Sequence, residues 1–462
     1  CVALTTFVAV QDGEHIHPVC GVACTDENGH SNVTWTAVSN LTSGMDADYY
    51  YLTNDVTLDA TWKPKSGTVL DLNGHSITVN ADVDAITVPV SCSFTLTDCN
   101  SSGGVHYFTK NTEKDNLWEP VGTGGDTTVT GGIITHSSGK NGSGIFMGGN
   151  GTFTMYGGTI CGNYNDTAAG AGVRATQSKI IMPGGAISGN VAANHKSGGG
   201  VNLNGVGSSF DMSGNAKITD NTTNGFGGGV HMECTGGKVS FTMSDNAQIT
   251  GNMCTGSACG GAGLYASGGE FTMNDNAAIS DNRSLSERGY GGGVFVSANA
   301  TFTVNGKATI SRNSAYIEST SSWKNNYGGG VLVLGGTFNM NGGSISDNMA
   351  ENGAGVYVKD NSSNAGTFTM NGGTIGGSNT DDANSAGFGG GLHHGAGQAQ
   401  LNGGMIQGNT ATSNGGGVFY SKNITLSGVT ITGNTANGTG GGAWMGVFDD
   451  IVMTVGGATT IT

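Results

Sequence analysis

Hydrophobic and polar residues alternate in short segments that return along the chain from about residue 142 to its end. Each repeat reads roughly as a glycine run followed by Val-x-Val, then a segment like TFTM, then a segment like TISGN. Equivalent positions of the TFTM segment, from Phe153 to Met453, recur with an average step of 30 residues. Alternation with a period of two, in segments rich in β-branched and aromatic residues, is typical of half-buried strands.

A regular repeat of short strands predicts a solenoid whose successive coils stack and share one long core. A coil of about 30 residues has room for three short strands, and equivalent strands would pair in parallel about 4.8 Å apart. The sequence therefore predicts an all-β fold, a right-handed parallel β-helix, over residues 49–462. Residues 1–48 precede the regular pattern and are expected to form a small N-terminal cap.

The alternation also predicts which side chains face the core. Phe271 and Met273 share one face of their segment, and Ile279 should belong to a third inward ladder. An Asn then closes the repeat, and its amide can donate and accept hydrogen bonds along the stack while tolerating left-handed backbone conformations. We expect this Asn ladder to be structural. Its predicted members are Asn163, Asn190, Asn221, Asn252, Asn282, Asn313, Asn348, Asn409 and Asn434.

The amino-acid composition favours some classes of binding partner over others. The 86 glycines fall in register with the repeat, so they mark turns and not a flexible linker. Only 11% of the residues are charged and the formal net charge is -16, which disfavours nucleic acid and anionic membranes. No apolar run is long enough for a membrane span. A surface rich in Asn, Thr, Ser and Gly is common in extracellular bacterial proteins and in surfaces that contact carbohydrate.

Four residues near the start have the types and close spacing of a tetrahedral zinc site: His15, His17, Cys20 and Cys24. Two histidines and two cysteines would make a closed structural site rather than an open catalytic one. A Cys20–Cys24 disulfide or free thiols would explain the same spacing. The chain has nine cysteines, and their spacing leaves disulfide pairing open. No cofactor is required elsewhere.

If Val201 and its equivalents face inward, the residue after each of them faces outward. These residues form a column along the coils, and many of them are aromatic rings or histidines that can stack on a sugar ring or contact a partner protein. The ligand-binding candidates in this column are His231, Tyr265, Phe295, Tyr357, His393, Phe419 and Trp444. Alternatively, segments near 284–290 or 316–327, or a second copy of the molecule, cover the column. If the alternation is the reverse, so that Val201 and its equivalents face outward, these rings would instead lie in the core.

Catalysis on a polysaccharide needs paired carboxylates, or a metal with a base, at one position. The best candidates are His231 and Glu233, which project from the same strand face. Acidic pairs elsewhere, such as Asp381 and Asp382, are expected to be solvated turn residues. No residue is therefore assigned a catalytic role, and enzymatic activity is not favoured.

Some segments resemble known repeats. FTMN at Phe271 and Phe368, FTVN at Phe302 and GGAI at 184–187 resemble the FxxN and GGAI repeats of polymorphic outer-membrane proteins. Residues 49–79 resemble the first coils of large β-helical surface proteins of Gram-positive bacteria. The resemblance covers roughly residues 49–462 and implies a β-helix on a secreted or cell-surface protein. The resemblance is a weak indication of activity, because lyases, hydrolases, tailspikes and adhesins all occur on β-helices. The last repeat stops midway at Thr462, so we expect the chain to be truncated.

Together these features predict a rigid extracellular scaffold that adheres to glycans or proteins on a host or microbial surface. A polysaccharide lyase or glycoside hydrolase on a β-helix is the alternative, with the outward column as its subsites. A spacer or filament subunit, with lateral self-association, is a third possibility. Ligand identity, oligomeric state and anchoring mode are left open by the sequence.

Overall fold

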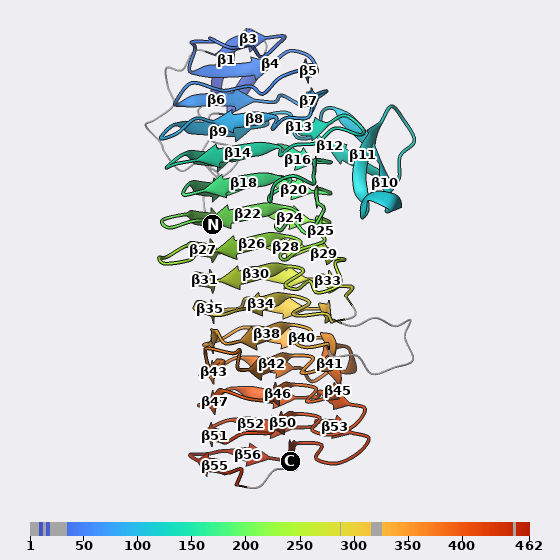
Figure 1. The fold of residues 1–462 in the computed structure, drawn as a ribbon, viewed down its shortest axis with the longest axis vertical. Coiled ribbons are helices and arrows are strands. Elements are labelled where there is room, and N and C mark those ends of the chain that lie inside the picture. Colours follow the sequence, from blue (N-terminus) through green and yellow to red (C-terminus); the bar gives the residue numbers. More distant parts are fainter. Residues whose placement is uncertain (1–8, 13–14, 19–34, 287, 316–325, 447–449) are drawn as a thin grey trace. The chain divides into compact units, whose positions relative to one another are not determined.

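The computed structural model describes residues 9–12, 15–18, 35–286, 288–315, 326–446 and 450–462 (Figure 1). Within these ranges the chain forms strands and two short 3-10 helices, η1 (Thr112–Lys114) and η2 (Thr380–Asp382). The strands belong to two compact units, residues 1–222 and 223–462, and each unit is described by itself. In both units most strands pair in parallel with the equivalent strand of the next repeat, which confirms the predicted parallel β-helix. None of the sheets closes on itself.

Unit 1, residues 1–222, contains four parallel sheets, named here for their ladder residues or for their place in the coil. The Phe sheet has the order β3 (Thr36–Val38), β4 (Tyr49–Leu52), β6 (Thr68–Asp71), β9 (Ser93–Thr97), β15 (Thr152–Met155), β19 (Lys179–Met182) and β23 (Ser209–Met212). The Ile sheet has the order β5 (Val56–Leu58), β7 (Ser76–Val79), β13 (Ile133–His136), β16 (Thr159–Cys161), β20 (Ala186–Ser188) and β24 (Lys217–Thr219). The Val sheet has the order β8 (Ile86–Val88), β14 (Ile145–Gly148), β18 (Val173–Thr176) and β22 (Val201–Asn204). The corner sheet contains β17 (Tyr164–Asn165) and β21 (Val191–Ala192), and β25 (Thr222–Thr223) lies where the two units divide.

Two antiparallel sheets also belong to unit 1. The first pairs β1 (Ala9–Asp12) with β2 (His15–Pro18). The second has β10 (Val105–Asn111) between β11 (Leu117–Val121) and β12 (Thr127–Thr130). Phe108 and Trp118 of this second sheet are buried against Ile133 and Cys161 of the coils. The insertion therefore covers one side of unit 1, which the repeat pattern did not predict.

Unit 2, residues 223–462, repeats the same four sheets. Its Val sheet has the order β26 (Val230–Glu233), β30 (Leu264–Ser267), β34 (Val294–Val296), β38 (Val331–Leu334), β42 (Val356–Lys359), β46 (Leu392–His394), β50 (Val418–Tyr420) and β54 (Ala443–Met445). Its Phe sheet has the order β27 (Ser240–Met243), β31 (Gly269–Met273), β35 (Ala300–Val304), β39 (Thr337–Met340), β43 (Thr367–Met370), β47 (Gln398–Leu401), β51 (Ile424–Ser427) and β55 (Met453–Gly456).

The Ile sheet of unit 2 has the order β28 (Gln248–Thr250), β32 (Ala278–Ser280), β36 (Thr309–Ser311), β40 (Ser344–Ser346), β44 (Thr374–Gly376), β48 (Met405–Gln407), β52 (Thr430–Thr432) and β56 (Thr460–Ile461). Its corner sheet has the order β29 (Met253–Cys254), β33 (Arg283–Ser284), β37 (Ser314–Ala315), β41 (Met349–Asn352), β45 (Ser385–Phe388), β49 (Thr410–Ala411) and β53 (Thr435–Ala436). A coil therefore has four strands where three were expected. The additional strand is mostly two residues long, too short to produce a recognisable period in the sequence.

The predicted inward ladders fill the core of each unit. In unit 2 the rings of Phe241, Phe271, Phe302, Phe338 and Phe368 stack on one another, with centroids 4.9, 4.7, 4.9 and 5.1 Å apart in turn. The Met and Ile ladders beside them are also fully buried. Burying one such side chain contributes on the order of 2–3 kcal/mol, so the repeated ladder is a large favourable contribution in every coil.

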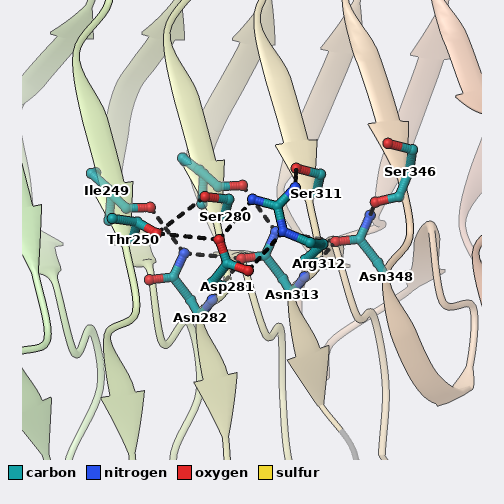
Figure 2. A network of polar contacts seen from close by, with 11 residues as sticks. Ile249, Thr250, Ser280, Asp281, Asn282, Ser311, Arg312, Asn313, Ser346 and Asn348 are labelled. Atoms are coloured by element: carbon teal, nitrogen blue, oxygen red, sulfur yellow. Dashed lines mark hydrogen bonds and ion pairs between the residues drawn. The ribbon is translucent and has the colours of Figure 1, made fainter. Parts of the chain in front are cut away.

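The Asn ladder is buried and continuous within each unit. Asn282 donates from Nδ2 to Oδ1 of Asn313 at 2.9 Å and to the carbonyl oxygen of Ile249 at 3.0 Å (Figure 2). Its backbone N–H donates to the same Oδ1 of Asn313 at 3.1 Å. Each side-chain amide thus supplies hydrogen-bond partners to the buried backbone N–H and carbonyl groups of its turn, which would otherwise have none. The predicted structural role of this ladder is confirmed.

Two ladder members were missed by the sequence pattern. In unit 2, Asn384 accepts from Asn348 Nδ2 at 2.9 Å and donates to Asn409 Oδ1 at 2.8 Å, so it fills the coil between them. An insertion that includes η2 separates it from Ile375, which obscured its place in the repeat. In unit 1, His136 takes the position before Asn163, with Nδ1 2.7 Å from Asn163 Oδ1.

The left-handed backbone position lies one residue before the ladder Asn and not at the Asn itself, which corrects the expectation. Asp281 has φ 59° and Arg312 has φ 56°. These two side chains meet across neighbouring coils, because Arg312 Nε and Nη2 donate to Asp281 Oδ1 and Oδ2, both at 2.8 Å (Figure 2). The paired hydrogen bonds offset part of the strain of a non-glycine residue in this conformation.

Candidate ligand-binding groove

The outward column of unit 2 lies on the face of the Val sheet opposite the core. Val294 and Val296 are fully buried among the core ladders, and Phe295 between them projects to the other side. The column residues pair in register from strand to strand. In sequence order they are His231, Tyr265, Phe295, Leu332, Tyr357, His393, Phe419 and Trp444.

Much of this column is covered by aromatic side chains of the same unit. Phe295, Leu332 and Tyr357 are 5%, 1% and 6% exposed. They form one apolar cluster with Tyr290 and Tyr327, which directly precede glycine runs. Tyr290 and Tyr327 come from the two segments considered as possible cover, so the column is not the open aromatic surface that the pattern suggested. Stacking on a ligand therefore needs a place where this cover ends.

The cover ends near Phe419 and Trp444. Their rings lie 4.8 Å apart and both are partly exposed. The residues before their glycine runs are Asn414 and Thr439, which are small and hydrogen-bonded to each other, with Thr439 N donating to Asn414 Oδ1 at 2.9 Å. Because these residues have no ring to lay over the column, its C-terminal end is only partly covered, by Phe388, whose ring centroid lies 5.7 Å from that of Phe419.

A groove of about 1010 Å³ lies beside this end of the column, within unit 2. It is bounded by the end of β42, by β46, by the outward side chains of β47 and β51, and by the turn 421–423. Asp450 and Ile451 complete its lining. Two of the predicted ligand-binding residues, Tyr357 and His393, therefore line an actual concavity.

Unequal turn lengths explain why the groove forms here. The turns that lead from the Val sheet to the Phe sheet are short at 395–397 and 421–423, and the preceding turn at 360–366 is longer. Glycine keeps the short turn clear, since a Cβ on Gly395 would lie 2.9 Å from the Tyr357 hydroxyl oxygen. A side chain at this turn would therefore fill the space in front of Tyr357.

Several polar side chains in the groove have no hydrogen-bond or ion-pair partner among the described residues. Within the described part of the chain, the side chains of Lys359, Gln398, Gln400 and Lys422 make no hydrogen bond or ion pair. The Lys359 ammonium lies 5.6 Å from the ring centroid of Tyr327, its one ring contact there. The neighbouring strand β43 has Thr367 and Thr369 at the positions that pair with Gln398 and Gln400, so β47 differs from it in carrying two long outward amides.

His393 and Tyr357, which are 8% and 6% exposed, border the groove only with the edges of their uncharged rings. Burial lowers the pKa of His393 to about 3, so its imidazole is neutral at neutral pH. Burial also raises the pKa of the Tyr357 hydroxyl. The two rings meet edge to face at 4.7 Å. His393 Nδ1 is buried and has no hydrogen-bond partner, an arrangement that is costly unless a ligand or water supplies one.

The candidate pair His231 and Glu233 lies outside the groove. His231 Nε2 is 3.9 Å from Glu233 Oε2, and the His231 ring stacks on Tyr265 at 5.2 Å. Burial lowers the pKa of His231 to about 4, so it is a neutral member of the ring stack at neutral pH. This geometry offers an imidazole near one half-exposed carboxylate, and we assign it no catalytic role.

The predicted zinc residues are only partly within the described ranges. The backbones of His15 and His17 lie in β2, and Cys20 and Cys24 lie outside the described residues. Elsewhere in the described ranges, no group of three or more His, Cys, Asp and Glu residues is placed to hold a metal ion. No helix in those ranges is long and apolar enough to cross a membrane.

Comparisons with known proteins give no relative from which a role could be transferred. No family model, curated protein or solved structure matches the chain. The function is therefore argued from the groove itself.

Proposed function

We propose that this protein is a rigid, extracellular bacterial surface scaffold that binds glycans in the groove beside Tyr357 and His393. The observation that carries this proposal is the combination, in one concavity, of ring edges with amide and ammonium groups that have no partner among the described residues. Sugars are recognised by amides that bind hydroxyl groups and by aromatic rings that contact the apolar face of the sugar. Binding by such groups requires no catalytic centre.

The architecture supports the scaffold part of the proposal. Each coil of unit 2 is joined to the next by parallel strands, by the core ladders and by the buried Asn ladder. Close-packed ladders of this kind hold the side chains that line the groove in fixed positions, which lowers the entropic cost of binding an extended ligand. The secreted or cell-surface location rests on the composition and on the resemblance of the repeats.

The test is binding of the whole chain to an array of immobilised oligosaccharides, followed by affinity measurements on the best ligands. We expect the double variant Gln398→Ala/Gln400→Ala to bind about tenfold or more weakly, because each lost hydrogen bond contributes about 1 kcal/mol. The matched control is Thr301→Ala/Thr303→Ala, which removes outward side chains from β35 of the same sheet. Absence of glycan binding by the unaltered chain, or equal loss in both variants, would sink the proposal.

A further inference from the structure

The groove carries a positive charge in a strongly negative protein. The chain has a formal net charge of -16. Among the lining residues that the structure describes there are two ammonium groups, Lys359 and Lys422, and one carboxylate, Asp450, so their formal charge is +2 - 1 = +1. His393 adds no charge, because burial keeps its imidazole neutral at neutral pH. The local charge is thus opposite in sign to that of the whole chain.

These two lysines form no ion pair among the described residues, whereas some other basic residues of unit 2 do. Arg312 is paired with Asp281 and Lys238 with Glu270, at 2.8 Å in both cases. Lys359 and Lys422 have no carboxylate within ion-pair distance among the described residues. The Asp360 carboxylate accepts from the backbone N–H of Gly366 at 3.0 Å and lies next to Gly397 at the edge of the groove, without forming an ion pair with either lysine.

We propose that the groove selects anionic glycans, with an acidic group of the sugar held by the ammonium groups of Lys359 and Lys422. This inference rests on the proposed glycan-binding function and specifies its ligand class. The amides of Gln398 and Gln400 bind the hydroxyl groups of the same sugar, and the edge of the His393 ring borders it. Carboxylate and sulfate share the required charge, so both are included in the test.

The Asp450 carboxylate should determine the orientation of an acidic ligand in the groove. Its carboxylate is the one acidic side chain among the described lining residues, and like charges repel an acidic ligand group placed next to it. The acidic group of the sugar should therefore sit at the lysines, and hydroxyl groups should face Asp450. A neutral sugar would gain nothing from the lysines beyond ordinary hydrogen bonds.

The experiment measures the affinity of the whole chain for four probes by titration calorimetry. The probes are a glucuronic-acid oligomer, the same oligomer with its carboxyl groups reduced to alcohols, a sulfated oligosaccharide of equal length and a polyglutamate peptide. We expect the glucuronic-acid oligomer to bind about tenfold more tightly than its reduced form. Affinity should fall between 50 and 200 mM salt, because exposed charge pairs are screened over about 10 Å.

The variants are Lys359→Gln, Lys422→Gln and the double substitution, with Lys307→Gln as the matched control. Lys307 is an exposed lysine of unit 2 that does not line the groove. Each exposed charge pair is worth up to about 1 kcal/mol, so each groove substitution should weaken binding of the acidic oligomer up to about fivefold. The double variant should bind the acidic and reduced oligomers with similar affinity, and the control should bind like the unaltered chain.

The possible outcomes separate the two proposals. Equal affinity for the acidic and reduced oligomers, unchanged by the lysine substitutions, would overturn the anionic preference and leave glycan binding intact. Tight binding of the sulfated probe alone would identify sulfate as the recognised group. Polyglutamate binding as tight as that of the oligosaccharides would overturn the glycan assignment. Failure of every oligosaccharide to bind would overturn both proposals.

Discussion

At the scale of single residues, burial decides the charge of the histidines on the Val sheet of unit 2. His231 and His393 have pKa values lowered to about 4 and about 3, because a charged imidazole is poorly solvated among packed side chains. Both are therefore neutral under ordinary conditions and act as flat polar rings. The unfolded chain, in contrast, protonates them at about pH 6.5.

This difference predicts an acid sensitivity of folding. As pH falls from about 6.5 towards 4, the unfolded state binds a proton at His231 before the folded state does, so stability is lost over that window. Substitution His231→Phe keeps a ring stacked on Tyr265 and removes the proton. We expect the free energy of unfolding to fall by up to about 3 kcal/mol more in the unaltered chain than in the variant between pH 7 and pH 4.

The measurement is urea unfolding of both proteins at a series of pH values. Glu351 acts in the opposite direction, since burial raises its pKa to about 7 and stability from this group is lost as pH rises. Because Glu351 is present in both proteins, its contribution cancels in the difference. Parallel pH profiles for the two proteins would contradict the assignment of a neutral buried His231.

At the scale of structural elements, the Asn ladder of unit 2 should be far more sensitive than its exposed counterpart. Asn313 is buried, accepts from Asn282 and donates to Asn348 Oδ1 at 3.1 Å. Substitution Asn313→Ala leaves several buried polar groups without partners, each costing about 1–3 kcal/mol. We expect a loss of about 3 kcal/mol or more in the free energy of unfolding, measured by urea denaturation.

The matched control belongs to a second amide ladder on the surface of the same unit. Asn371 donates to Asn341 Oδ1 at 2.9 Å and is exposed, so water replaces its partners after substitution. Asn371→Ala should therefore cost less than about 1 kcal/mol. Similar losses for the two variants would mean that burial is not what makes the inner ladder stabilising.

The sequence predicted these elements to different degrees. The strands with the Phe, Met and Ile ladders follow from strict alternation, and they appear in the structure at those positions. The corner strands escaped prediction because a two-residue strand has no period. Asn384 escaped because η2 and its flanking residues separate it from the rest of its repeat. The antiparallel sheet of β10, β11 and β12 in unit 1 escaped because it lies outside the repeat altogether.

At the scale of the whole molecule, the composition predicts a salt effect on stability. The formal net charge of -16 makes the folded chain repel itself, and salt screens that repulsion. We expect the melting temperature to rise between 10 and 150 mM sodium chloride, by roughly 1 °C for each 1 kcal/mol of relieved repulsion in a chain of 462 residues. Ion pairs such as Asp281–Arg312 weaken in salt but are few. Scanning calorimetry with sucrose at matched osmolality as the control would test this, and a fall in melting temperature would contradict it.

The candidate site was only partly foreseeable. Tyr357 and His393 were identified as outward residues and do line the groove, whereas Phe295, of the same column, is covered by rings from neighbouring turns. Lys359 was considered together with Asp360 and interpreted as a solvated turn residue, and Gln398 was not identified, because isolated polar residues in a polar repeat carry no periodic signal. Only their convergence beside Gly395 distinguishes them from other surface residues.

The sequence by itself determined the parallel coil, its inward ladders and the buried line of Asn residues. These features are repeated in every coil, and a local pattern of period two is enough to specify them. The tertiary structure decided which outward rings are covered and where a groove opens. Those outcomes depend on turns of unequal length and on side chains from different coils that meet in space, which no single repeat contains.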